Sequence, residues 1–150
     1  LAQCDVPSLP TTPLGGIADR MKVIGLFREL RGDLSDSLPS IHDEAGKLNL
    51  DVAVRIKSYL HNGIGVFDVM EAVRDPLDTS QYISGGSSLV SDGEYIWRHD
   101  LAHFVERYRV ALPNEFVQHV LEKAAPPDAT VVMSKADEIW RAYGEAERGG

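Results

Sequence analysis

The stretch SLVSDGEYIWRHDL, residues 88–101, contains the strongest signal for a β-hairpin in the chain. At its centre the dipeptide Asp92-Gly93 separates two short runs, residues 88–91 and 94–97. Asp-Gly is typical of tight hairpin turns, because glycine adopts the positive φ angles that such turns require. We therefore predict an antiparallel hairpin here. Its apolar face or faces would be supplied by Leu89, Tyr95 and Trp97.

Three segments after this hairpin have apolar residues at helical spacing. We expect the first helix to have Asp100 as its N-cap, where a carboxylate accepts hydrogen bonds from free backbone N–H groups. The second helix would begin at Leu112-Pro113 and stop before Pro126-Pro127. The third would be capped by Ser134.

The part of the chain before the hairpin is less regular. Its apolar spacing predicts a helix over Ile17–Arg31, then a long loop with at most one short helical turn over 33–49. Another helix before the hairpin would start at Asp51 and stop at Asn62-Gly63, which is a common ending for helices. Residues 65–70 are expected to form a strand.

Together these elements predict an α+β fold, a single mostly helical domain with a small antiparallel sheet. Residues 1–16 contain several prolines and end in two glycines, so we expect an irregular N-terminal arm before a domain over 17–148. Six aromatic side chains at helix or strand spacing are expected in the core: Trp97, Phe104, Tyr108, Phe116, Trp140 and Tyr143.

Composition narrows the classes of function. The net charge of −8 argues against nucleic acid and anionic membranes as partners, because both are bound by basic surfaces. An acidic surface favours encounter with a basic protein instead. The single cysteine, Cys4, suits a reducing cytoplasm, and no apolar run approaches the roughly 18 residues that cross a bilayer. We expect a cytoplasmic protein without a cofactor.

One cluster of residues could carry metal chemistry. In His99-Asp100-Leu101-Ala102-His103 the two histidines are four residues apart, which places imidazoles on one face of a helix. Asp100 as N-cap would leave His99 outside that helix, so satisfied surface histidines are the favoured interpretation. The segment 85–89 also lacks the second glycine of a serine-hydrolase elbow. No catalytic or metal-binding residue is therefore predicted, and we do not expect an enzyme.

The segment Tyr82–Ser88 is the best candidate for a binding surface. Its glycines and serines predict a flexible loop that could enter a narrow cleft, and the adjacent hairpin would hold it in position. A plain solvent-exposed connection is the alternative. The candidate partner-binding residues are Tyr82, Ser84, Gly85, Gly86, Ser87 and Ser88.

The motif of residues 91–101, followed by Phe104…Tyr108 and Leu112-Pro113…Phe116, resembles a known group. Small actinobacterial proteins share the pattern D-G-x-[WY]-x-W-x-x-D-L…Y…L-P-x-x-F. The group includes toxin-immunity proteins such as the immunity factor of the tuberculosis necrotizing toxin, an NAD-degrading enzyme. Tyr95 stands where tryptophan is usual, and the motif covers roughly a fifth of the chain. Its residues are turn, cap and core residues, so the resemblance supports the fold more directly than the function.

The resemblance implies an antitoxin that binds a cognate toxin domain and blocks its active site, with an NAD glycohydrolase as the toxin. It transfers no partner-contacting residue to this chain. Two alternatives stay open. One is a small metal-dependent hydrolase that uses His99, Asp100 and His103, and the other is a structural or adaptor domain.

Overall fold

The predicted hairpin forms the centre of the protein. The structure, a computed structural model, describes residues 21–31, 37–123 and 126–148. Strand β6 (Leu89–Ser91) pairs with β7 (Tyr95–Arg98) in antiparallel register, with Val90 opposite Trp97. The turn at Asp92-Gly93 is confirmed, and Gly93 has the positive φ of 98° that favours glycine there. Leu89, Tyr95 and Trp97 are all buried, as predicted.

The hairpin supplies the two inner strands of a four-stranded sheet with the order β2-β7-β6-β3. Strand β3 (Ile64–Phe67) runs antiparallel to β6, while β2 (Lys22–Val23) runs parallel to β7. A separate two-stranded sheet is formed by β4 (Ala72–Arg74) and β5 (Tyr82–Ser84). The predicted α+β fold is confirmed. The larger sheet is mixed rather than purely antiparallel, because of β2.

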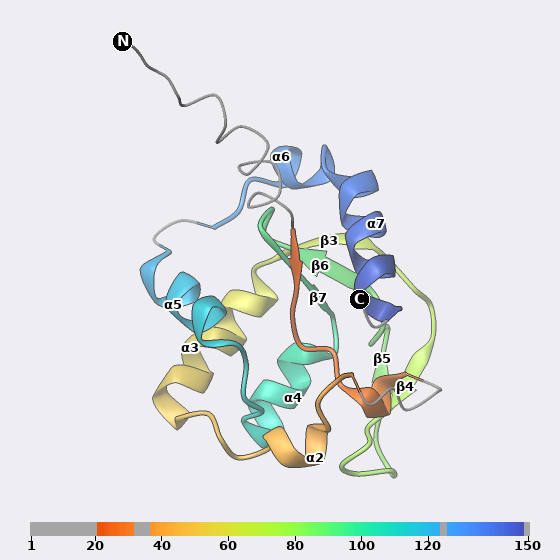
Figure 1. The fold of residues 1–150 in the computed structure, drawn as a ribbon, viewed down its shortest axis with the longest axis vertical. Coiled ribbons are helices and arrows are strands. Elements are labelled where there is room, and N and C mark those ends of the chain that lie inside the picture. Colours follow the sequence, from red (N-terminus) through yellow and green to blue (C-terminus); the bar gives the residue numbers. More distant parts are fainter. Residues whose placement is uncertain (1–20, 32–36, 124–125, 149–150) are drawn as a thin grey trace.

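Both faces of the hairpin are covered, and each carries its own apolar cluster. Tyr95 and Trp97 belong to a cluster with side chains of α3 (Leu50–His61), α4 (Leu101–Tyr108) and α5 (Asn114–Glu122). Leu89 and Ile96 belong to the other cluster, with α6 (Ala129–Met133) and α7 (Ala136–Glu147). Figure 1 shows α3, α4 and α5 on one side of the strands and α7 on the other. This two-sided burial accounts for the nearly uninterrupted burial of β6 and β7.

The prediction of a helix over Ile17–Arg31 is wrong over its described part. Residues 22–23 form β2, and only a short 3-10 helix, η1 (Arg28–Leu30), follows. Gly25 has a φ of 72° and lies against the side chain of Leu101, so the chain bends there and cannot continue as a helix. Met21, Ile24 and Phe27 are still buried, as apolar residues of an extended segment rather than of a helix face.

The boundaries of two helices and one strand also differ from expectation. α3 is capped by Asn49, whose side chain accepts hydrogen bonds from two backbone N–H groups, and Asp51 lies inside its first turn. The predicted strand over 65–70 starts one residue earlier and ends at Phe67. Ser134 caps no helix start. It ends α6, which the sequence pattern did not predict, and Lys135 is the residue before α7.

Other expectations agree with the structure or lie outside the described residues. α2 (Ile41–Glu44) is the short helical turn predicted within 33–49. The proposed N-terminal arm over 1–16 falls outside the described part of the chain. Trp140 was expected in the core but is 59% exposed, with its ring 5.1 Å from that of Phe67. Among the described helices, none has the length and apolar character needed to cross a bilayer.

The bend at Gly25 can be tested against a matched glycine. Gly25 and Gly46 both have positive φ, but an added Cβ would lie 2.7 Å from Leu101 at Gly25 and meets nothing within 4 Å at Gly46. Gly46→Ala should lower the free energy of unfolding by about 1 kcal/mol, the backbone cost alone. Gly25→Ala should lower it by about 3 kcal/mol because overpacking is added. Urea unfolding of both variants measures the difference, and equal losses would contradict this packing.

Candidate functional site

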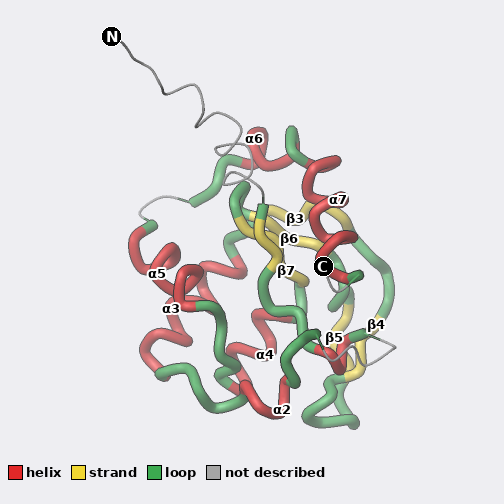
Figure 2. The backbone as a smooth tube through the Cα atoms, in the orientation of Figure 1, coloured by secondary structure: helices red, strands yellow, loops and turns green. Residues whose placement is uncertain are grey.

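A groove of about 710 Å³ opens beside the β4–β5 hairpin. The connection from β3 to β4, residues 68–71, forms one wall, and β6 contributes Leu89 and Val90. This connection follows the outer margin of the molecule (Figure 2). Ala72 and Ser84, which lie opposite each other in the small sheet, also line the groove.

The groove continues onto the solvent-facing side of the β4–β5 hairpin. Side chains alternate along a strand, so Arg74 and Tyr82 lie on the same side as Ala72 and Ser84. All four residues are exposed, whereas Ile83 faces the core and is 9% exposed. The Arg74 guanidinium hydrogen-bonds the Tyr82 hydroxyl and lies 5.2 Å from the centre of its ring.

The segment Tyr82–Ser88, predicted as a flexible loop, is instead a strand followed by a tight turn. Its first three residues form β5. The sequence did not indicate this strand, because β5 and its partner β4 are each only three residues long. The turn that follows is held by hydrogen bonds. Gly85 N–H donates to the carbonyl of Glu71 at 2.7 Å, and Val69 N–H donates to the Ser88 hydroxyl at 2.8 Å.

The start of α4 fixes the same turn from the other side. Asp100 N–H donates to the carbonyl of Gly86 at 3.0 Å, and His99 N–H donates to that of Ser88 at 2.7 Å. Asp100 stands directly before α4, as predicted, but its side chain makes no capping hydrogen bond. It forms a buried ion pair with Arg98 at 2.8 Å instead. Burial raises the pKa of the Asp100 carboxyl to about 6, against the opposing effect of Arg98.

The structure sorts the six predicted binding residues into two sets. Four lie on the groove or on the hairpin face that continues it: Tyr82, Ser84, Gly85 and Ser88. Gly86 is buried, and a Cβ there would lie 3.0 Å from the Val73 side chain, so it is a packing residue that could not act as part of a plug. Ser87 is outside the groove lining, and its hydroxyl donates to Glu71.

Sequence reasoning missed the most exposed part of this surface. Met70, on the wall of the groove, is 99% exposed, although the sequence pattern placed it in a strand. Glu71 follows it and Asp68 lies two residues before it, and neither forms an ion pair with another described residue. His99 lines the groove as well. No sequence signal marks these residues, because their exposure depends on where β3 ends.

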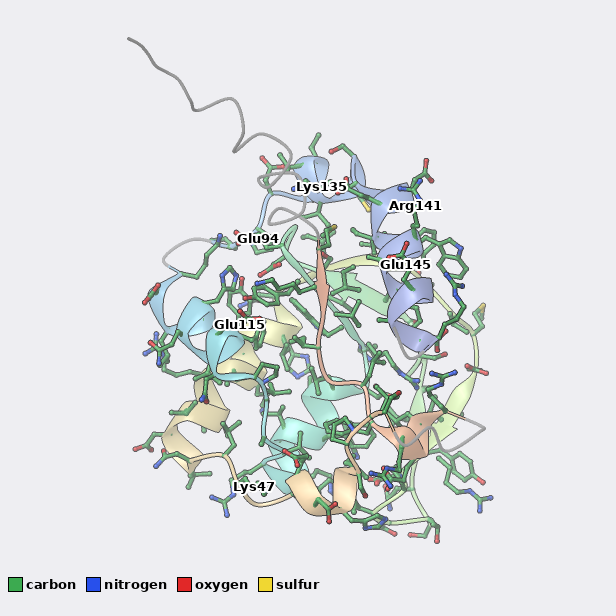
Figure 3. The ribbon with its side chains drawn as sticks, in the orientation of Figure 1. Lys47, Glu94, Glu115, Lys135, Arg141 and Glu145 are labelled. Atoms are coloured by element: carbon green, nitrogen blue, oxygen red, sulfur yellow. The ribbon has the colours of Figure 1, made fainter. Side chains whose placement is uncertain are left out.

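Elsewhere, two buried aspartates organise matching clusters that the sequence also did not reveal. At the β6–β7 turn, Asp92 Oδ1 accepts hydrogen bonds from Glu94 N–H and Tyr95 N–H. Its Oδ2 accepts the Tyr59 hydroxyl of α3 and lies 2.8 Å from His119 Nε2 of α5. Around the turn, Glu94 pairs with Lys123, and Lys135 donates to the Gly93 carbonyl; Figure 3 labels Glu94 and Lys135 there.

The second cluster repeats this arrangement at the turn after β4. Asp75 Oδ1 accepts two backbone N–H groups, from Leu77 and Asp78. Its Oδ2 accepts the Tyr108 hydroxyl and lies 2.8 Å from His103 Nε2. A turn follows β4 at this point, and the Asp75 carboxylate ties the end of β4 to α4.

These contacts shift the acidity of both carboxyls. Burial alone would raise the pKa of Asp75 and Asp92, but the hydrogen bonds from tyrosine, histidine and the backbone outweigh it. Both pKa values therefore lie below the ordinary value of 3.8. Burial and the Asp75 carboxylate raise the pKa of Tyr108 to about 12.

The proposed metal cluster does not form. His99 lines the groove, Asp100 pairs with Arg98, and His103 contacts Asp75. Within residues 21–31, 37–123 and 126–148, no group of three or more His, Cys, Asp or Glu residues is arranged to hold a metal ion. Among the described residues, the three side chains of the hydrolase alternative therefore do not form a set of metal ligands.

Comparisons with protein-family models, with curated proteins and with solved structures found no match for this chain.

The Asp92 cluster predicts a loss of stability in acid. Because the folded pKa of this carboxyl is depressed, its contribution is fully present above about pH 4 and is lost as the pH falls through the folded pKa. Asp92→Ala should lower the free energy of unfolding at pH 7 by about 3 kcal/mol, since several buried donors lose their acceptor. The variant should also lose less stability than the parent chain between pH 4 and pH 2.

Urea unfolding over this pH range measures both effects. Asp43→Ala, which removes an exposed carboxylate of α2, is the matched control and should stay within about 0.5 kcal/mol of the parent. An Asp92→Ala variant as stable as this control would show that the cluster is not a structural tie.

Proposed function

We propose that this protein is an antitoxin, an immunity protein that binds a toxin enzyme and blocks its active site through the groove beside β4 and β5. The observation that carries the binding role is the exposure of Met70 on the groove wall, 99% accessible within a well-anchored segment. The toxin as partner, and an NAD glycohydrolase as its class, come from the resemblance in sequence pattern.

Burial of Met70 by a partner would supply substantial binding energy. Transfer of a methionine side chain from water to an apolar contact contributes about 1.5–3 kcal/mol. Its flexible thioether adapts to irregular partner surfaces, which suits methionine to binding sites. Tyr82, 55% exposed on the continuing hairpin face, adds an aromatic side chain of the kind enriched in interfaces.

The backbone under this surface is already ordered, which favours tight binding. Glu71 and Val69 hydrogen-bond the turn that follows β5, and backbone N–H groups just before α4 donate to carbonyls of the same turn. Ordering a loop on association costs free energy, so a surface fixed in advance binds more tightly for the same contacts. In place of the flexible loop expected from the sequence, the proposed contact surface consists of the groove wall and the outer face of the β4–β5 hairpin.

Charge is consistent with an inhibitor of a basic enzyme. The chain has a net charge of −8, and Asp68 and Glu71 on the groove wall form no ion pair among the described residues. Acidic surfaces accelerate encounter with basic ones and disfavour acidic competitors. A steric mechanism needs no catalytic group on the antitoxin itself.

A direct test uses the protein encoded next to the gene for this chain, which the proposal expects to be a toxin enzyme. The two proteins are co-expressed, purified through a tag on one of them, and assayed for consumption of NAD. We expect a stoichiometric complex and loss of the toxin's NAD turnover. A neighbouring enzyme that stays active in the presence of excess antitoxin would overturn the proposal, whereas inhibition of a different toxin activity would overturn only the NAD assignment.

The groove as contact surface is tested by paired methionine variants. Met70→Glu should weaken the complex by about 30-fold or more, because a buried apolar contact is replaced by a charge. Met133→Glu on α6, where the side chain is 46% exposed, is the matched control and should leave the affinity within about twofold. Calorimetric titration measures both, and equal affinities would place the interface elsewhere.

A further inference from the structure

The hydrogen bonds of the small sheet show which backbone groups of β4 face outward. Asp75 N–H donates to the carbonyl of Gln81, and Gly85 N–H donates to that of Glu71. In an antiparallel pair, hydrogen-bonded positions alternate with positions whose N–H and C=O groups point away from the partner strand. Ala72 and Arg74 lie between the bonded positions, so their backbone groups point outward, away from β5.

This outer edge of β4 has no strand beside it in the described part of the chain. Sheet β4–β5 contains only two strands, and no other described segment accepts the N–H of Ala72 or Arg74. Both residues are exposed. An isolated two-stranded hairpin is marginal by itself, and an open edge is a template for a further strand.

The open edge lies beside the groove. Ala72 is on the β4 edge and also lines the groove, next to Met70 and Glu71. A strand added along β4 would direct every second side chain to the solvent-facing side of the sheet, where the groove opens. Backbone pairing and side-chain contacts would thus come from one segment of the partner.

We propose that the partner docks by adding an extended, basic segment to the outer edge of β4, which extends the small sheet to three strands. This inference rests on the proposed function and specifies how the surface is used. Main-chain hydrogen bonds to Ala72 and Arg74 supply the register, and side chains in the groove supply the selectivity.

Charge distinguishes this occupant from a second copy of the chain. Two copies would bring together molecules of net charge −8, with Asp68 and Glu71 near the contact on each. Pairing through a three-residue strand also buries far less than the roughly 1,200 Å² of a stable dimer. Lysine or arginine side chains on the added strand would instead neutralise Asp68 and Glu71.

The test needs no natural partner. The probe is an end-capped heptapeptide of alternating lysine and valine, titrated into the isotope-labelled full chain and followed by amide NMR. We expect saturable shifts confined to residues 68–75 and 82–88, with a dissociation constant on the order of 1 mM. Hydrogen exchange of the Ala72 and Arg74 amides should slow at saturation, because both become donors to the added strand.

Two altered peptides separate strand addition from other binding. The same peptide with N-methyl groups on its central amides cannot pair with β4 and should lose binding at least tenfold. A peptide with glutamate in place of lysine should also bind at least tenfold more weakly. Equal shifts with the N-methylated peptide would overturn strand addition, and shifts in the free chain that depend on its own concentration would point to a second copy.

A backbone variant tests the same edge from the protein side. Ala72→Pro removes the outward N–H without breaking a β4–β5 hydrogen bond, and proline is tolerated at such edge positions. It should abolish protection at Arg74 and reduce peptide affinity at least tenfold. Ala129→Pro is the matched control, since it puts proline at the first residue of α6, where proline is tolerated. Unchanged affinity in a folded Ala72→Pro chain would overturn the proposal.

The outcomes separate docking mode from function. Absence of peptide binding alongside toxin inhibition would remove strand addition and leave the antitoxin role in place. Peptide binding without inhibition of any neighbouring enzyme would remove the antitoxin role and leave strand addition in place.

Discussion

The carboxylate of Asp92 is the contact on which the rest of the structure depends. One of its oxygens closes the β6–β7 turn through two backbone N–H groups, and the other joins Tyr59 on α3 to His119 on α5. Sequence-distant elements thus share one buried acceptor. Because an unpaired buried carboxylate is costly, these contacts stabilise the turn and both helices in this mutual arrangement. The resulting hairpin presents Tyr95 and Trp97 to one apolar cluster and Leu89 and Ile96 to the other.

The groove depends on this central hairpin. β6 and β7 are fixed on both faces, and only His99 and Asp100 separate the end of β7 from the start of α4. Backbone N–H groups of His99 and Asp100 then hold the turn after β5, and the Asp75 cluster fixes the far end of β4 to the same helix. The small hairpin, which has too few strands to be stable alone, is therefore held at both ends. The candidate surface, which few of its own residues stabilise, is held in place by its contacts with α4.

Sequence patterns predicted the parts of the fold that local chemistry determines. The Asp92-Gly93 turn, the stop at Asn62-Gly63 and the start after Pro113 each depend on neighbours along the chain. The segment 21–27 was misjudged because its apolar spacing fits a helix face, and only tertiary contact between Gly25 and Leu101 fixes the bend. The candidate surface was found in part. Small polar residues indicated Ser84, Gly85 and Ser88, but the exposure of Met70 and the burial of Gly86 depend on packing that spacing does not encode.

The features that keep the β4 edge from unwanted pairing would also make the proposed strand addition selective. A strand of three residues is too short to recruit arbitrary chains, and the charged side chain of Arg74 disfavours flat association. Asp68 and Glu71 add repulsion against acidic chains, including copies of this one. A basic strand would neutralise the same carboxylates, so the charge that disfavours acidic partners would favour basic ones. Selectivity of this kind needs no deep pocket, because it comes from backbone geometry and charge together.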